Sequence, residues 1–234
     1  MDKTRLKIRS MLSLSAPADA LYAYYVFYHD RDRTELHVHE RDDGGADGFL
    51  AVCQTAQRLF QPTLVLRTSK ADVASTMLRD VLKPGRPYYL ITTPDLKKSA
   101  TQVVEMPDPE VSRIYEIDLS RFNYSVNVLV VSEGGVEDRP RFLVRAEGEV
   151  VAEAGVSWLS PQFAGVHVRA TGAALERGLG ESVLATCTRW IIRSGRHPLA
   201  IVAKPDDVTT SLVERVGYLD SGARELSGDV ICCL

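Results

Sequence analysis

The chain has 234 residues, of which 45% are hydrophobic and 25% are charged. These fractions are ordinary for a soluble globular protein, and the length suits one large domain or two small ones. The 28 basic and 31 acidic side chains leave a net charge of −3, so nucleic acid is not expected as the main partner.

The sequence carries no recognisable signal for export or for a membrane. The apolar run near the N-terminus is too short for a secretory signal, and no stretch approaches the ~18 continuous apolar residues of a membrane helix. Cys53, Cys187, Cys232 and Cys233 show no C-x-x-C spacing, and adjacent cysteines rarely bond to each other. We therefore expect buried free thiols in a cytoplasmic protein with no membrane partner.

In the first 120 residues, helices and strands are expected to alternate. Ser15 and Pro17 are typical of a helix start, and the turn Asp-Asp-Gly-Gly at 42–45 predicts a hairpin between the flanking strands. The expected helices span 15–28, 71–82 and 95–105, and the expected strands span 34–41, 49–55, 63–68, 88–92 and 114–119. This order predicts an α/β or α+β module with its own core.

The second half begins with a predicted buried strand at 126–131, followed by an acidic, glycine-containing link at 132–138. A Glu147-Gly148 turn predicts a hairpin, and Pro161 precedes a further strand. The remaining expected elements are strands at 141–145, 150–158 and 165–168, a connection at 170–174, a helix ending at 194, a strand at 197–203, a helix after 206 and a final strand at 224–233.

Residues 175–194 are the stretch around which the second half is organised. A glycine-rich turn, Arg177-Gly178-Leu179-Gly180, precedes an amphipathic helix, and a strand precedes the turn. A strand, a glycine turn and a helix leave unpaired backbone N–H groups at the helix start, where the helix dipole favours an anion. Glycines also let a phosphate approach the backbone closely. The sequence therefore predicts a pyrophosphate cradle, with a packing turn as the alternative.

Two common phosphate motifs do not fit this turn. A Walker loop needs Lys-Ser or Lys-Thr after its second glycine, where Glu181-Ser182 stand, and Val183 replaces the third glycine of a dinucleotide fingerprint. The turn resembles the acyl-CoA-binding motif of the GNAT superfamily of N-acyltransferases, Arg/Gln-x-x-Gly-x-Gly/Ala. Gly178 and Gly180 occupy the two small-residue positions, whereas Leu175 departs from the leading Arg/Gln.

A second GNAT signature, Asn-x-x-Ala-x-x-Leu-Tyr-x-Lys-x-Gly-Phe, resembles the segment from Asp206 to Tyr218. The positions of Asn, Ala, Leu, Lys and Gly-Phe fall on Asp206, Thr209, Leu212, Arg215 and Gly217-Tyr218. The resemblance covers about the last hundred residues. It implies a mixed, mostly antiparallel central sheet flanked by helices, with a CoA-binding acetyltransferase domain at 123–234. Residues 1–122 are expected to form an α/β lobe that is a degenerate copy of the fold or a lid.

The resemblance implies transfer of an acetyl or acyl group from acetyl-CoA to a primary amine of a small molecule or peptide, by direct attack in a ternary complex. It also implies a monomer or homodimer. The expected CoA-binding residues are Val166, Val168, Arg177, Gly178, Leu179, Gly180, Glu181, Ser182 and Asp206. The alternative is a CoA-binding or structural module that has lost catalysis.

The candidate catalytic residues are Glu153, His167 and Ser211. Glu153 stands in an otherwise apolar strand that would raise the pKa of its carboxyl, which suits a base; a solvated glutamate is the alternative. His167 faces away from the flanking valines and is either a base or a structural histidine. The resemblance implies a tyrosine that protonates the CoA thiolate, but Val213 stands in its place. Either Ser211 or water supplies that proton, or the thiolate leaves unassisted, or catalysis is lost. Tyr218 fills a packing position.

His37 and His39 lie on one face of a predicted strand, with His29, Asp30 and Glu40 nearby. Two imidazoles at this spacing can ligate a metal, but no third ligand follows at a recognisable spacing. Alternation places such residues on a solvated face, so no metal is expected.

Overall fold

The computed structural model describes residues 2–56, 58–134 and 139–233. The chain forms two compact units: Met1–Ser112 with Arg224–Leu234 (unit 1), and Arg113–Ala223 (unit 2). Strand β12, Tyr218–Cys232, therefore contributes its first residues to unit 2 and the rest to unit 1. The predicted domain boundary after residue 122 remains a prediction.

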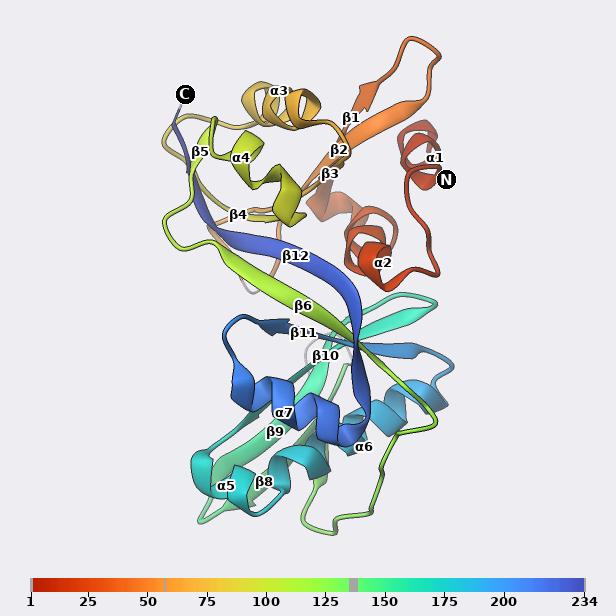
Figure 1. Ribbon diagram of the computed structural model, residues 1–234, viewed down its shortest axis with the longest axis vertical. Helices are drawn as coiled ribbons and strands as arrows, with labels where there is room; N and C mark the ends of the chain where they lie inside the picture. The colour runs from red at the N-terminus through yellow and green to blue at the C-terminus, as the bar shows by residue number, and fades with distance from the viewer. Residues whose placement is uncertain (1, 57, 135–138, 234) are drawn as a thin grey trace. The chain divides into compact units, whose positions relative to one another are not determined.

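Unit 1 is a mixed sheet in the order β1-β2-β3-β4-β12 (Figure 1). The pairs β1–β2, β2–β3 and β4–β12 are antiparallel, whereas β3 and β4 are parallel, joined by the crossover helix α3. Its elements are α1 (Lys3–Arg9), α2 (Pro17–Ala23), a π-helical turn (Tyr24–Tyr28), β1 (Thr34–Glu40), β2 (Ala46–Cys53), β3 (Thr63–Thr68), α3 (Ala71–Val81), β4 (Pro87–Thr92), α4 (Lys97–Ala100), β5 (Val104–Glu105) and the start of β6 (Glu110–Ile117).

The core of unit 1 lies beneath α3 and α4. Alternate strand residues Leu64, Leu66 and Leu90 pack with Met77 and Leu78 of α3, because successive side chains of a strand point to opposite faces. Arg67, the next residue of β3, faces the other way and forms an ion pair with Asp19 of α2 at 3.0 Å. The sheet of unit 1 therefore carries helices on both faces.

Unit 2 repeats this order of elements. Its strands follow the order β6-β11-β10-β9-β8-β7, with antiparallel pairing from β7 to β10 and parallel pairing of β10 with β11. Its elements are β7 (Val131–Gly134), β8 (Pro140–Ala146), β9 (Glu149–Leu159), β10 (Phe163–Ala170), α5 (Gly172–Glu176), α6 (Leu179–Arg193), β11 (His197–Ala203) and α7 (Asp207–Val216).

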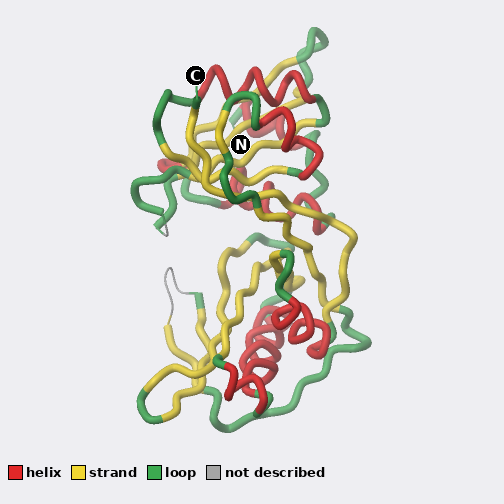
Figure 2. Tube along the Cα trace, turned by 60° about the vertical axis from the view of Figure 1, so that its left-hand side comes forward, coloured by secondary structure: helices red, strands yellow, loops and turns green. Residues whose placement is uncertain are grey.

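The helices of unit 2 gather on one side of its strands (Figure 2). Val183, Leu184 and Cys187 of α6 pack with Ala154 of β9 and Val166 of β10 in one buried cluster. These α6 residues are spaced at i, i+1 and i+4 and lie on one face, so the amphipathic helix predicted within residues 175–194 buries its apolar side. The mixed α/β fold with a largely antiparallel sheet flanked by helices is therefore confirmed.

Several predicted elements are wrong in detail. Residues 126–130 are not a buried strand: Val128 is 90% exposed, and β7 begins only at Val131. The helix expected over 95–105 is two short pieces followed by β5. The final strand begins at Tyr218, because Gly217 ends α7 in a left-handed conformation and the chain turns at once. The link at 132–138 lies partly outside the described residues.

Two further expectations concern cysteines and membranes. All four cysteines are free, but Cys233 is exposed, unlike the buried thiols expected. Across the described residues, no helix combines the length and apolar character that crossing a membrane requires.

Candidate functional site

Strands β10 and β11 separate at the centre of unit 2. Their parallel ladder pairs Phe163–Val166 with His197–Ala200 and then ends, although β10 continues to Ala170 and β11 to Ala203. On its other edge β10 stays paired with β9, with a register shift between Gly165 and Val166. The shift skips Ser157, so β9 carries the extra residue of a β-bulge, which bends that strand and increases the local twist. The backbone of β10 beyond Val166 therefore has one edge that β11 does not cover.

The N-terminus of α6 follows shortly after this opening. Its N-cap, Gly178, has φ +68° and provides no side-chain cap to the helix. Leu179, Gly180 and Glu181 carry the first N–H groups of a 15-residue helix, which have no carbonyl partner within it. These N–H groups and the helix dipole suit an anion at this position.

The two glycines of the turn serve different purposes. Gly178 adopts the left-handed conformation, which side chains with a Cβ disfavour, and a Cβ there would meet only Glu181 Oε2, at 3.9 Å. Gly180 is buried, and a Cβ there would lie 2.7 Å from Leu212 Cδ1 of α7. Gly180 is therefore explained by close packing of α6 against α7, rather than by access for a phosphate. The packing alternative holds for this second glycine.

Glu181 places a carboxylate at the start of α6. Its Oε1 accepts hydrogen bonds from Arg215 of α7 at 2.7 and 2.6 Å, while its buried Oε2 has no partner among the described residues. Arg215 also donates to the Ser211 hydroxyl at 2.8 Å. The carboxylate is thus partly neutralised by a guanidinium, and Ser211 keeps its own hydroxyl proton for donation.

The remaining residues of the predicted cradle differ in their availability. The Ser182 hydroxyl donates to the Gly178 carbonyl and accepts from Asn127, so its hydrogen-bonding capacity is largely used. Arg177 is exposed, and its side chain has no hydrogen-bond partner within the described residues. Asp206 is the N-cap of α7 and accepts a hydrogen bond from the Thr209 N–H at 2.9 Å.

The residues near the end of α7 are structural. Val213, at the position where tyrosine is common, is fully buried and offers no proton. Tyr218 is also buried, its hydroxyl lies 2.7 Å from that of Thr188, and burial raises its pKa. Tyr218 is therefore a packing residue, as predicted.

Glu153 lies on the sheet face opposite α6, between two arginines. It is 5% exposed, and its carboxylate accepts hydrogen bonds from Arg141 of β8 and Arg169 of β10. Desolvation pushes its pKa upward, but the two guanidiniums outweigh that effect, and the net pKa is lowered. The predicted raised pKa is wrong, and so is the solvated alternative, because cross-strand arginines bury and neutralise the charge.

His167 lies beside this cluster. Its neighbours Val166 and Val168 pack toward α6, so the imidazole faces away from them, as alternation predicted. The ring lies over Gly155 of β9, where a Cβ would be 2.7 Å from His167 Cε1. Desolvation lowers its pKa; Glu153 opposes this, and the nearby arginines add to it. The imidazole is thus neutral near pH 7 and is positioned one residue past the end of the β10–β11 ladder.

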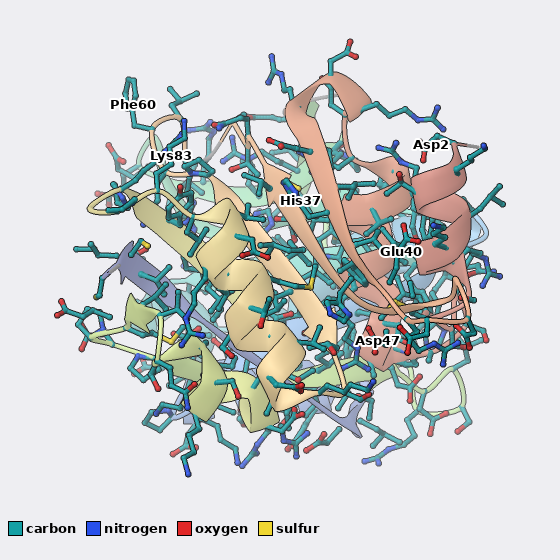
Figure 3. All side chains as sticks on the ribbon, turned by 90° about the horizontal axis from the view of Figure 1, so that it is seen from above. Asp2, His37, Glu40, Asp47, Phe60 and Lys83 are labelled. Carbon is teal, nitrogen blue, oxygen red and sulfur yellow. The ribbon has the colours of Figure 1, made fainter. Side chains whose placement is uncertain are left out.

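The paired histidines of unit 1 do not share a site. His37 lies 3.1 Å from Glu35, and His39 lies 2.7 Å from Asp47 (His37 and Asp47 are labelled in Figure 3). Among the described residues, no group of three or more histidine, cysteine or acidic side chains is arranged to hold a metal ion.

Comparison with known proteins shows the fold. No protein-family model and no curated protein matches the chain. Among solved structures, the chain is similar to a putative GNAT-family acetyltransferase from Novosphingobium aromaticivorans, with TM-score 0.59 and 13% identity over 78% of this chain and 88% of that one. It is also similar to a GCN5-related N-acetyltransferase from Kribbella flavida, with TM-score 0.60 and 13% identity over 92% and 93%.

A third similar structure is a tandem GNAT protein from the clavulanic acid biosynthesis pathway, with TM-score 0.58 and 12% identity over 100% of this chain and 96% of that one. At such identities the likeness concerns the fold alone. The chain therefore has the fold of GNAT acetyltransferases. This structural likeness does not depend on the two short sequence motifs.

Sequence reasoning missed three residues that shape this region: Arg141, Arg169 and Asn127. The first two stand on strands flanking Glu153, and an acidic residue in the middle strand with arginines on both neighbours is a signal for a cross-strand ion cluster. The third had no signal, because Asn127 reaches Ser182 across 55 residues of sequence.

Proposed function

We propose that the protein is an acyl-CoA-dependent N-acyltransferase that transfers an acetyl or acyl group from acetyl-CoA to a primary amine. The observation that carries this proposal is the opening between β10 and β11 beside the uncapped N-terminus of α6. An unpaired strand edge and a set of helix N–H groups are what a pantetheine chain and a pyrophosphate can bind, respectively. Unit 2 is the proposed catalytic unit, acting in the cytoplasm.

The donor site follows from these backbone groups. The N–H groups of Leu179, Gly180 and Glu181 are proposed to bind the pyrophosphate, with exposed Arg177 as an additional cation. The free edge of β10, from Val166 to Val168, is proposed to bind the pantetheine amides. Ser182 and Asp206 act by holding the starts of α6 and α7 in place, since their side chains already bond within the protein.

Acyl-CoA supplies an activated thioester, and the residues of β10 supply the rest of the chemistry. His167 is proposed to accept the proton that the amine loses when its nitrogen bonds to the acyl carbon, because its lowered pKa keeps the ring neutral. A backbone N–H of β10 donates to the oxygen that gains charge. The carbon–sulfur bond breaks with its electron pair on sulfur, and Ser211 or water donates a proton to the leaving thiolate. Glu153, ionised between arginines, positions the strands beside His167.

The test is thermal unfolding with and without acetyl-CoA, followed by an assay of thiol release with a panel of amines. A ligand at about 100 times its Kd should stabilise the folded protein by about 2.7 kcal/mol. The variant Gly178→Glu places a side chain and a negative charge at the helix start, and it should abolish this shift. If neither acetyl-CoA nor longer acyl-CoAs raise the melting temperature of the wild type, the proposed donor site is wrong, and the fold reflects common ancestry without acyl-CoA binding.

A matched control separates loss of binding from backbone strain. Gly195 follows the other end of α6, also has a positive φ, +78°, and has open space around it, with nothing within 4 Å of where a Cβ would lie. Gly195→Glu therefore carries comparable strain away from the proposed site. It should lower the melting temperature to a similar extent while retaining the acetyl-CoA shift. Equal loss of the shift in both variants would contradict the cradle.

A further inference from the structure

Unit 1 contains a group of buried polar side chains with unpaired atoms. Tyr22 Oη of α2, Thr93 Oγ1 after β4 and Glu225 Oε2 of β12 are all buried and have no hydrogen-bond partner among the described residues. Their side chains belong to residues that are 2%, 8% and 4% exposed. Buried polar atoms are almost always paired, so several unpaired ones in one region indicate a missing partner.

The sheet register places two of these groups side by side. In the antiparallel ladder of β4 with β12, Thr92 pairs with Leu226 and Ile91 with Ser227. One further step in the same register sets Thr93 opposite Glu225, on the face that also carries Ile91 and Ser227. Tyr22 is close enough for the Glu225 charge to affect its hydroxyl.

The charges around Glu225 point to the kind of partner that is missing. Within the described part of the chain Glu225 has no ion pair, and its one charged neighbour of note, Glu110 of β6, has the same sign. Burial, with a smaller contribution from Glu110, raises the pKa of the carboxyl to about 8. The other titratable groups that interact with it are phenols: Tyr22 of α2, Tyr25 of the π-helical turn and Tyr89 of β4. Two of these rings already carry a cation: the Arg67 guanidinium lies 5.2 Å from the centre of the Tyr22 ring, and that of Arg58 lies 3.7 Å from the centre of the Tyr89 ring. These arginines form their ion pairs with Asp19 and Asp229, so within the described residues the Glu225 carboxyl itself has no counter-charge.

A pocket of about 500 Å³ lies in the same unit, although none of the three unpaired side chains lines it. Two of the charged residues that affect the Tyr22 hydroxyl, Arg67 and Asp95, line the pocket. Arg67 is already paired with Asp19, and Asp47 with Lys70. Asp95, by contrast, has no ion pair within the described residues. The charge that lacks a partner is therefore negative in the pocket, as it is in the buried group.

We propose that unit 1 is a binding site for a ligand with a protonated amine, whose ammonium group is held by the Glu225 carboxylate together with the hydroxyls of Tyr22 and Thr93. The ammonium donates the hydrogen bonds that these oxygens lack. The carboxyl loses its proton to solvent as the ion pair forms. This proposal concerns unit 1 alone and does not depend on acyl transfer.

The test is calorimetric titration of the 234-residue protein with n-butylammonium, without acyl-CoA, in two buffers that differ in ionisation enthalpy. Because Glu225 is protonated at pH 7 in the free protein, binding should release close to one proton, and at pH 9 almost none. The neutral n-butanol should not bind. Failure of the wild type to bind n-butylammonium at millimolar concentration would overturn the proposal, whether or not acetyl-CoA binds to unit 2.

Three variants distinguish the proposed contacts from general effects. Glu225→Gln keeps the shape of the side chain and should lose at least tenfold in affinity and all of the proton release. Tyr22→Phe should weaken binding severalfold and keep the proton release. Glu110 is exposed, and its negative charge helps to raise the Glu225 pKa. Glu110→Gln should therefore retain binding but release fewer protons at pH 7, because the Glu225 pKa falls. If Glu225→Gln binds like the wild type, the buried carboxyl is structural and the proposal is wrong.

Discussion

The two units share a chain path but differ at the point where their parallel strands separate. In both, three antiparallel strands lead into a helical crossover and a fourth, parallel strand: β1-β2-β3, α3 and β4 in unit 1, and β8-β9-β10, α6 and β11 in unit 2. In unit 1 the ladder ends after Val65 with Ile91, and the Thr92 hydroxyl then donates to the Leu66 carbonyl at 3.0 Å. A side chain thus joins the two strands beyond the ladder.

In unit 2 no such bond joins β10 and β11 among the described residues, and His167 follows the end of the ladder. The N-caps of the crossover helices differ in conformation: Lys70 before α3 is extended, whereas Gly178 before α6 is left-handed, and neither provides a side-chain cap. The comparison teaches that topology alone does not create the site. The proposed donor site needs an open strand edge beside an uncapped helix start, and among the described residues only unit 2 combines these with an imidazole at the opening. We propose that unit 1 is the degenerate lobe.

The largest expected effect tests the imidazole. His167→Asn should lower kcat by about 10²-fold or more, because a general base typically contributes 10²–10⁴-fold. In the wild type the rate should rise with pH through a pKa below the usual 6.5 and stay level above it, since the base acts when deprotonated. His197→Asn, on β11, is the control and should keep both rate and profile. An unchanged pH profile in His167→Asn would show that water, and not His167, accepts the proton of the amine.

The next effect concerns the buried acid of unit 1. Burial raises the pKa of Glu225 from 4.5 to about 8 in the folded protein. As pH rises, the carboxyl of the unfolded chain therefore loses its proton at a lower pH than the carboxyl of the folded protein. The folded state consequently loses stability between pH 4.5 and about pH 8. At pH 7, Glu225→Gln should therefore increase the free energy of unfolding by about 2–3 kcal/mol. The gain should vanish near pH 4. Denaturant titrations across pH measure it, with exposed Glu105→Gln as the control.

A smaller effect tests the bond that closes the opening in unit 1. Thr92→Val removes a buried donor from the Leu66 carbonyl and should lower the free energy of unfolding by about 1–2 kcal/mol. Thr101→Val removes an exposed hydroxyl that donates to the Lys98 carbonyl, and should change stability by less than about 0.5 kcal/mol. Equal effects of the two changes in chemical denaturation would show that the Thr92 bond does not hold β3 and β4 together.

The smallest effect concerns the carboxylate at the start of α6. Glu181→Gln removes a negative charge from the proposed pyrophosphate site and should tighten acetyl-CoA binding about two- to fivefold, as expected for one charge at a helix terminus. Glu214→Gln makes the same change in net charge on an exposed position of α7 and should leave the affinity unchanged. Weaker binding by Glu181→Gln would instead indicate that the Glu181–Arg215 pair holds the turn in its binding conformation.

The local pattern of the sequence determined most of the elements and the fold. Strands 63–68 and 197–203 were predicted residue for residue, because alternation and flanking turns define such short strands. The glycine turn and the helix after it were found from spacing alone, as was the orientation of His167, because successive strand residues face opposite sides.

Only the tertiary structure decided what each of these residues does. Gly180 is explained by Leu212 on another helix, Glu153 is ionised by arginines on two neighbouring strands, and Glu225 is buried without a counter-charge among the residues that the structure describes. Each role depends on partners far away in the sequence, and the local spacing of residues does not reveal these partners. Local propensity determines elements, whereas pKa values and packing constraints arise from non-local contacts that form only when the chain folds.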